Sequence, residues 1–122
     1  MLIFIHGINA NADEWQPLLK YFNNRKFSCE AVNLREGLDL RKTHFQDYVI
    51  KVKAMVTPND ILIGHSMGGL IVQKIPEETT IKGGIAICSV RDLNTSLPVK
   101  ICRGRDLNSF LMVKNQVFLL LA

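Results

Sequence analysis

Residues 61–69 of this 122-residue chain read Ile-Leu-Ile-Gly-His-Ser-Met-Gly-Gly, and they decide the fold more than any other stretch. The apolar run at the start is typical of a buried strand, and the apolar residues that follow predict a helix that ends at Pro76. Gly64 and Gly68 lie two positions either side of a serine, and a Cβ at those positions would strike a neighbouring strand or helix in a sharp turn. The stretch therefore predicts a nucleophile elbow that lifts the Ser66 hydroxyl clear of the sheet. The alternative is a glycine-rich turn with an incidental serine.

A second motif lies at the N-terminus, where the apolar run Leu2-Ile3-Phe4-Ile5 leads directly into His6-Gly7-Ile8-Asn9. We expect the end of this strand to face the elbow. One strand thus closes with His-Gly and another with Gly-His-Ser-Met-Gly-Gly. With these two motifs, residues 1 to about 90 resemble the α/β-hydrolase superfamily, specifically its lipase- and esterase-like serine hydrolases.

The resemblance implies a set of site residues and a reaction. Ser66 would attack the carbonyl of a carboxylic ester or a lipid-like ester, so the partner would be a small-molecule ester or acyl substrate and no cofactor would be needed. The elbow residues around the serine would be Gly64, His65 and Gly68. The backbone N–H groups of Met67 and Ile8 would form the oxyanion hole, and His6 and Gly7 would support the oxyanion loop.

Strands and helices alternate along the chain, which predicts an α/β fold with a parallel sheet covered by helices. Four strands are expected, over residues 2–5, 28–34, 60–63 and 81–90. We expect residues 1–90 to form a partial α/β-hydrolase core that is truncated before the family's last strands. Residues 91–122 then predict the start of a lid-like or terminal helical segment, with a helix over residues 110–122. Under this interpretation the strand at 81–90 is an exposed edge, and we expect the chain alone to be marginally stable, to self-associate through that edge or to aggregate.

Length and composition limit the remaining classes of function. A chain of 122 residues with 48% hydrophobic content can bury one core, yet complete members of the family are longer. The net charge of +4 comes from scattered residues without interleaved aromatics, which argues against a nucleic-acid partner. No apolar run reaches the roughly 18 residues of a membrane span. The three cysteines lack a metal-ligand spacing, so no metal is expected, and the absence of a basic leader favours a cytoplasmic protein.

A general base is the missing part of the predicted site, because an unassisted serine hydroxyl is a poor nucleophile at neutral pH. The resemblance implies a histidine after the nucleophile, but the histidines of this chain are His6, His44 and His65. We expect His65 to point into the interior beside Ser66. Asp92 is a weak candidate for the triad acid, with a turn or helix cap as its alternative role. Two hypotheses stay open, an incomplete serine hydrolase and a catalytically inactive module that binds a small apolar or acyl ligand.

Overall fold

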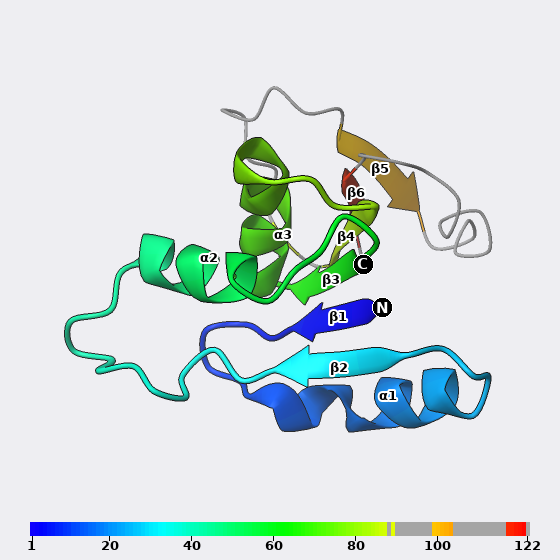
Figure 1. The fold of residues 1–122 in the computed structure, drawn as a ribbon, viewed down its shortest axis with the longest axis horizontal. Helices are drawn as coiled ribbons and strands as arrows, with labels where there is room; N and C mark the ends of the chain where they lie inside the picture. The colour runs from blue at the N-terminus through cyan, green and yellow to red at the C-terminus, as the bar shows by residue number, and fades with distance from the viewer. Residues whose placement is uncertain (88, 90–98, 104–116, 122) are drawn as a thin grey trace.

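A computed structural model describes residues 1–87, 89, 99–103 and 117–121. Its centre is a six-stranded sheet in the order β2-β1-β3-β4-β6-β5, in which every neighbouring pair of strands is parallel (Figure 1). The strands are β1 (Leu2–Ile5), β2 (Cys29–Val32), β3 (Ile61–His65), β4 (Gly83–Ile87), β5 (Val99–Arg103) and β6 (Val117–Leu121).

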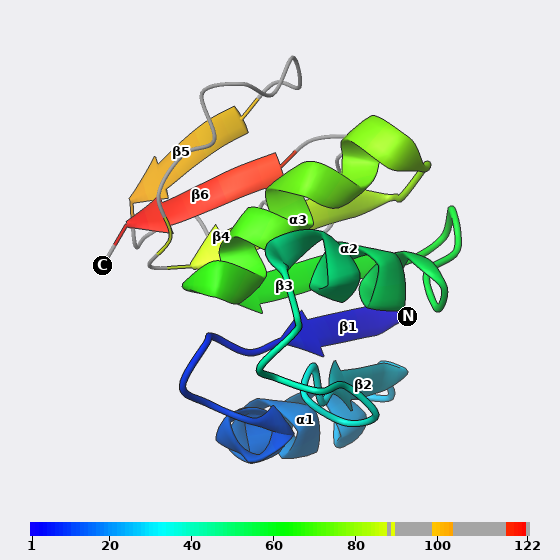
Figure 2. The ribbon, with the colours of Figure 1, turned by 90° about the vertical axis from the view of Figure 1, so that its left-hand side faces the viewer.

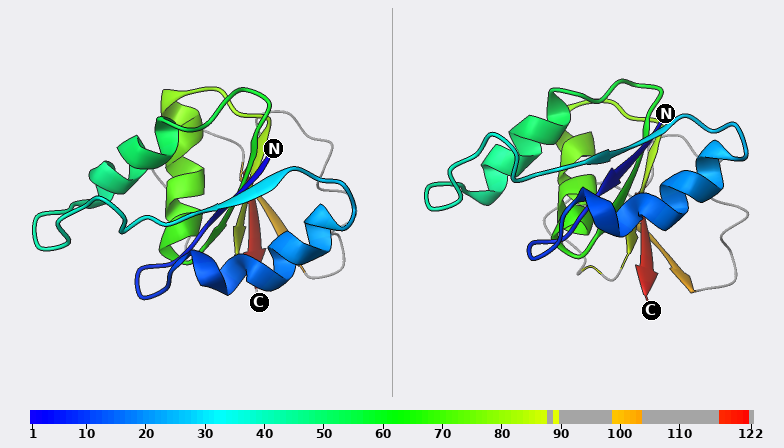
Figure 3. Two further views of the ribbon diagram at one scale, coloured as in Figure 1. Left: turned by 60° about the horizontal axis from the view of Figure 1, so that its bottom comes forward. Right: turned by 90° about the horizontal axis from the view of Figure 1, so that it is seen from below.

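Helices cover both faces of the sheet, as expected for parallel strands joined by helical crossovers. They are the 3₁₀ helix η1 (Ala12–Trp15) and the α-helices α1 (Gln16–Asn23), α2 (Phe45–Lys53) and α3 (Met67–Glu78). Helices α2 and α3 lie over one face (Figure 2), and α1 lies on the opposite side of the sheet (Figure 3). Helix α3 runs two residues past Pro76, so the predicted helix end was wrong; a proline in the last turn removes only one helical hydrogen bond.

Strand β1 shows how the sequence builds two cores from one sheet. Ile3 and Ile5 pack with the buried residues of α2 and α3, whereas Leu2 and Phe4 pack with Trp15 on the other face. Successive side chains of a strand point to opposite faces, and here both faces are covered. All four residues of β1 are therefore buried, which explains why the strand reads as a continuous apolar run.

The predicted parallel sheet with flanking helices is confirmed, and the four expected strands are all present. Two further strands, β5 and β6, extend the sheet beyond them. The helix expected over 110–122 is wrong at residues 117–121, which form β6, while residues 110–116 lie outside the described residues. The run Val-Phe-Leu-Leu-Leu is apolar at every position, so its hydrophobic pattern does not distinguish a buried strand from a helix. The prediction of a helix failed for this reason.

The predicted sheet edge at residues 81–90 is also wrong. Strand β6 pairs with β4 from Gly84 to Ile87, so the backbone groups on that side of β4 already have partners. The sheet ends instead at β2 and β5. Self-association through β4 therefore loses its physical basis, because a paired strand offers no template to a second chain. The division of the chain at residue 90 stays a prediction.

The register of the strands brings the two predicted motifs together. Ile5, at the end of β1, is paired with Val32 of β2 on one side and with Gly64 of β3 on the other. The His6 loop and the Ser66 turn therefore leave neighbouring strands at the same edge. Because the chain moves from β1 to β2 on one side and then to β3 on the other, the strand order reverses here, where open parallel sheets bind ligands.

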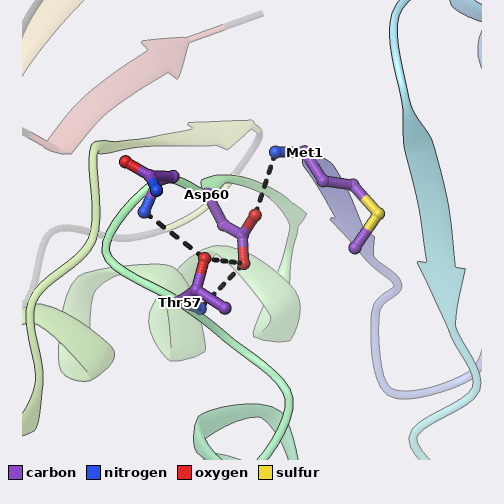
Figure 4. Close-up of polar contacts among 4 residues, drawn as sticks. Met1, Thr57 and Asp60 are labelled. Atoms are coloured by element: carbon purple, nitrogen blue, oxygen red, sulfur yellow. Dashed lines mark hydrogen bonds and ion pairs between the residues drawn. The ribbon is translucent and has the colours of Figure 1, made fainter.

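A buried carboxylate, that of Asp60, joins the amino ends of β1 and β3, opposite the strand ends that carry the two motifs. Asp60 accepts hydrogen bonds from the Met1 ammonium group at 2.9 Å, from the Thr57 N–H at 2.7 Å and from the Thr57 hydroxyl at 3.0 Å (Figure 4). Burial alone would raise the pKa of Asp60, but the bond from the ammonium group and the two bonds from Thr57 outweigh it and lower the pKa.

Candidate active site

The backbone at Ser66 is held in a conformation that L-residues rarely adopt. Ser66 connects β3 to α3 with φ 54° and ψ −115°. Its N–H donates to the Ile87 carbonyl of β4 at 2.9 Å, and its own carbonyl accepts from the Gly69 N–H at 2.9 Å. Such an outlier costs about 1–3 kcal/mol and persists only where the surroundings determine it, as these bonds do. Strained residues of this kind cluster at functional sites.

Two glycines allow the close packing that creates this turn. A Cβ added to Gly64 would lie 2.1 Å from the Gly68 carbonyl oxygen, and a Cβ added to Gly68 would lie 2.2 Å from the Ile5 carbonyl oxygen. Both distances are far below van der Waals contact, and the colliding atoms are backbone atoms that cannot rotate away. The first turn of α3 therefore rests directly on β3 and β1, as the glycine spacing predicted.

The loop after β1 lies against Ser66. A Cβ built on Gly7 would be 3.2 Å from the Ser66 Cβ, so the absence of a side chain at Gly7 leaves the serine accessible from this side. Ser66 itself is partly exposed, whereas His6 and Gly7 are buried. The His-Gly motif and the serine turn thus meet at the carboxyl edge of the sheet.

His6 holds this loop with both of its ring nitrogens. Nε2 lies 3.0 Å from the Leu34 nitrogen, whose N–H can only donate, so Nε2 must be the unprotonated acceptor. The proton is therefore on Nδ1, which donates to the Gly7 carbonyl at 2.7 Å. In a trans peptide unit the C=O and the next N–H point in opposite directions, so fixing the Gly7 carbonyl also fixes the direction of the Ile8 N–H.

Two backbone N–H groups beside Ser66 are available to a ligand. Met67 is the first residue of α3, and the first N–H groups of a helix have no intrahelical acceptor. Ile8 follows Gly7 in the loop that touches Ser66. Among the described residues, neither N–H donates a hydrogen bond to a protein acceptor. Two such donors suit a developing negative charge better than a neutral group.

Arg35 is a site residue that the sequence analysis did not single out. Its guanidinium group donates to the Ile8 carbonyl, so the loop after β2 supports the loop after β1. Arg35 follows directly on Leu34, whose N–H donates to His6, so both residues of this segment support the loop after β1. The sequence alone could not give the pairing, since the two residues are 27 positions apart.

The expected orientation of His65 was wrong. Its side chain is 41% exposed rather than interior, and Nδ1 lies 3.7 Å from the Glu14 carboxylate of η1. The reason is strand alternation, because His65 shares a face with Ile63, and that face is the one covered by η1 and α1. At the end of β3, where His65 lies, this face is covered only by the exposed residues of η1, so the His65 side chain stays partly exposed. Glu14, the partner of His65, was also missed.

Neither of the other histidines is presented to Ser66. His6 has both ring nitrogens engaged, and His44 lies at the start of α2, where its N–H donates to Asp47 at 2.7 Å. In the part of the chain that the structure describes, no imidazole is hydrogen-bonded to Ser66. Asp92, the weak acid candidate, lies outside the described residues, so its role stays a prediction.

The described residues contain no group of three side chains suited to holding a metal ion. Nor do they include a helix with the length and apolarity that a bilayer crossing requires. The predicted cytoplasmic location stays a prediction.

Solved structures with the same fold include several hydrolases. A lipase-esterase related protein from Clostridium acetobutylicum is 24% identical, with a TM-score of 0.58 over 72% of this chain and 41% of that one. A membrane phospholipase A that is a bacterial virulence factor is 18% identical, with a TM-score of 0.63 over 79% and 34%. A YdeN-like hydrolase from Pectobacterium atrosepticum is 15% identical, with a TM-score of 0.57 over 98% and 75%.

The chain thus spans less than half the length of the first two of these structures. Comparison with curated proteins finds no match to the sequence. A family model described as the Alpha/beta hydrolase family matches residues 2–117, which is most of the chain. This chain therefore belongs to the α/β-hydrolase family.

Proposed function

We propose that the protein is a serine hydrolase that acts on carboxylic ester or lipid-like ester bonds, with Ser66 as the nucleophile. The observation that carries this proposal is the strained Ser66 backbone at φ 54°, set beside two N–H groups that have no acceptor among the described residues. Family membership supports hydrolysis as the class of reaction. The choice of an ester over other acyl groups rests on the resemblance of the two motifs to lipases and esterases.

In the proposed reaction, the Ser66 Oγ attacks the ester carbonyl carbon while its proton passes to a base. The carbonyl electrons move onto the oxygen, where the Met67 and Ile8 N–H groups stabilise the negative charge. Collapse of this intermediate releases the alcohol with the proton and leaves an acyl-serine, which water then hydrolyses. His6 acts as a positioning residue, since its Nδ1–H holds the Gly7 carbonyl and thereby the Ile8 N–H.

The base is proposed to be a histidine outside these 122 residues, with Asp92 as a weak candidate for its acid partner. His6 is unsuitable as the base because both of its ring nitrogens are hydrogen-bonded to backbone groups. That same observation favours a second candidate function. In it, the chain is a catalytically inactive member of the family that binds a small apolar or acyl ligand beside Ser66.

Hydrolysis of p-nitrophenyl acetate by Ser66→Ala and by a matched control, Ser28→Ala, tests the proposal. Ser28 is exposed and lies at the opposite edge of the sheet, before β2, so its substitution leaves the site intact. We expect slow hydrolysis that Ser66→Ala lowers and Ser28→Ala preserves, because without the serine only the residual catalysis of oxyanion stabilisation and binding is left. Equal rates of hydrolysis in Ser66→Ala and Ser28→Ala would refute Ser66 as the nucleophile. No hydrolysis in a folded chain that still binds an ester analogue would favour the inactive module.

A further inference from the structure

A second hollow lies far from Ser66, at the amino ends of β1 and β3, where the N-terminus is marked in Figure 1. Its volume is about 250 Å³, and its lining includes Leu2, Phe27, Ile61 and two lysines, Lys26 and Lys82. These residues come from β1, from the turn between α1 and β2, from β3 and from the residue before β4. The hollow therefore forms only when the sheet is assembled.

One part of this lining is apolar and fixed in place. Leu2 and Ile61 are register partners in β1 and β3, and both pack in the core on the α1 side of the sheet. The Phe27 ring packs edge-on against Phe22, with ring centroids 5.8 Å apart, yet Phe27 stays 40% exposed. An apolar group that covers this ring gains free energy in proportion to the apolar area that it removes from water.

Two lysines give the hollow a positive charge. Among the described residues, the ammonium groups of Lys26 and Lys82 have no hydrogen-bond or ion-pair partner. None of the described residues that line the hollow carries a carboxylate. Asp60, the residue before Ile61, is already engaged by the Met1 ammonium group and by Thr57. Unpaired cations beside an apolar surface suit an anion that carries an apolar chain.

The backbone at Lys26 has a conformation that favours glycine. Helix α1 ends in a Schellman motif, in which the Lys26 N–H donates to the Asn23 carbonyl at 3.0 Å and the Phe27 N–H donates to the Phe22 carbonyl at 3.1 Å. Lys26 has φ 64°, and glycine is the usual residue at this position because it has no Cβ. Residues held in such conformations cluster at functional sites. A cation here is also favoured by the negative end of the helix dipole, so Lys82 is the more specific test of a ligand site.

We propose that this hollow, the amino-edge site, binds a small carboxylic acid in its ionised form. The carboxylate lies beside Lys26 and Lys82, and the apolar chain covers Leu2, Ile61 and Phe27. The volume is below the range of roughly 300–1,000 Å³ for ligand sites, which restricts the chain to a short one. One negative charge is favoured over two, because the C-terminal end of α1 carries a partial negative charge. The site does not depend on the proposed function, since none of its residues belongs to the serine site.

Titration of the isotope-labelled chain with hexanoate, followed through the amide NMR shifts, tests the proposal. We expect saturable shifts at the amides of Phe27 and Lys82. The uncharged 1-hexanol should bind about fourfold to twentyfivefold more weakly, since two exposed ion pairs contribute about twofold to fivefold each. Acetate, which lacks most of the chain, should bind at least about tenfold more weakly. Equal binding of hexanoate and 1-hexanol would overturn the proposal, and so would hexanoate shifts confined to the amides of Ile8 and Met67.

Three variants that each remove one positive charge separate the amino-edge site from a general effect of net charge. Lys82→Gln and Lys26→Asn should each weaken hexanoate binding about twofold to fivefold, and asparagine tolerates positive φ, so the turn is kept. Lys42→Gln makes the matched change at an exposed position between β2 and α2 and should leave the affinity unchanged. Equal weakening by all three variants would refute the site. Unchanged affinity in Lys82→Gln would also refute it, because Lys82 takes no part in the end of α1.

Discussion

The strained backbone at Ser66 predicts an inversion of the usual order of alanine and glycine variants. Ser66→Ala and Ser66→Gly both remove the hydroxyl, but only glycine adopts φ 54° and ψ −115° without a clash at Cβ. Relief of the outlier is worth about 1–3 kcal/mol. The larger conformational entropy of glycine in the unfolded chain opposes this by about 0.4–1 kcal/mol. We therefore expect Ser66→Gly to be more stable than Ser66→Ala by about 1–2 kcal/mol.

Urea unfolding of the two variants measures this difference, with the m-value as the check that both unfold from equally compact states. Ser28 supplies the control pair, because positive φ values among the described non-glycine residues occur at Lys26 and Ser66 and not at Ser28. Ser28→Gly should be less stable than Ser28→Ala, by about 0.5–1 kcal/mol. If the glycine variant is the less stable one at Ser66 as well, the turn is not strained and the assignment of an elbow fails.

Three further outcomes are expected. Asp60→Asn should destabilise the fold by about 1–3 kcal/mol near neutral pH, by loss of charge-assisted bonds. Because the folded-state pKa of Asp60 is lowered, the carboxylate stabilises the fold fully above its ordinary pKa of 3.8. The stabilities of the unmodified protein and of Asp60→Asn, measured by acid denaturation, should therefore converge as the pH falls through the folded-state pKa. Gly68→Ala should cost at least about 3 kcal/mol by urea unfolding, or prevent folding, because its Cβ would lie 2.2 Å from the Ile5 carbonyl oxygen. His6→Phe should cost about 1–3 kcal/mol in the same assay, since the buried Leu34 N–H loses its acceptor. It should also lower the rate of hydrolysis per folded molecule, and an unchanged rate would argue against the positioning role of His6.

The sequence predicted the parts of the fold that depend on local patterns. The strands β1 and β3 are apolar runs that end in glycine motifs, and the elbow needs glycines at fixed spacing, so both were found without a structure. The position of both motifs at the carboxyl ends of their strands also followed, because the strands were expected to be parallel. Strand β6 was missed because its apolar run is equally compatible with a helix.

The partners of the site residues could not be predicted in the same way. The pairing of His65 with Glu14 and the bond from Arg35 to Ile8 join residues that are far apart in the chain. Such contacts depend on where helices and loops come to rest on the sheet, and no short sequence period encodes that. His6 illustrates both limits, because its support of the loop was implied by the resemblance while its second partner, Leu34, emerged only from the fold.

The bonds made by the segment after β2 determine where this protein can change length during evolution. Leu34 is tied to His6 through its N–H and, through its carbonyl, to Lys51 of α2 at 3.5 Å. Arg35 is tied to Ile8, and the Glu36 carbonyl accepts a bond from the same lysine. An insertion within these three residues would shift the carbonyl and amide groups next to Ser66. The Leu38 N–H still donates to the Arg35 carbonyl at 3.2 Å, which closes a turn on this segment. Variants with added residues between Leu38 and the start of α2 should therefore keep the site intact while reshaping the surface around it.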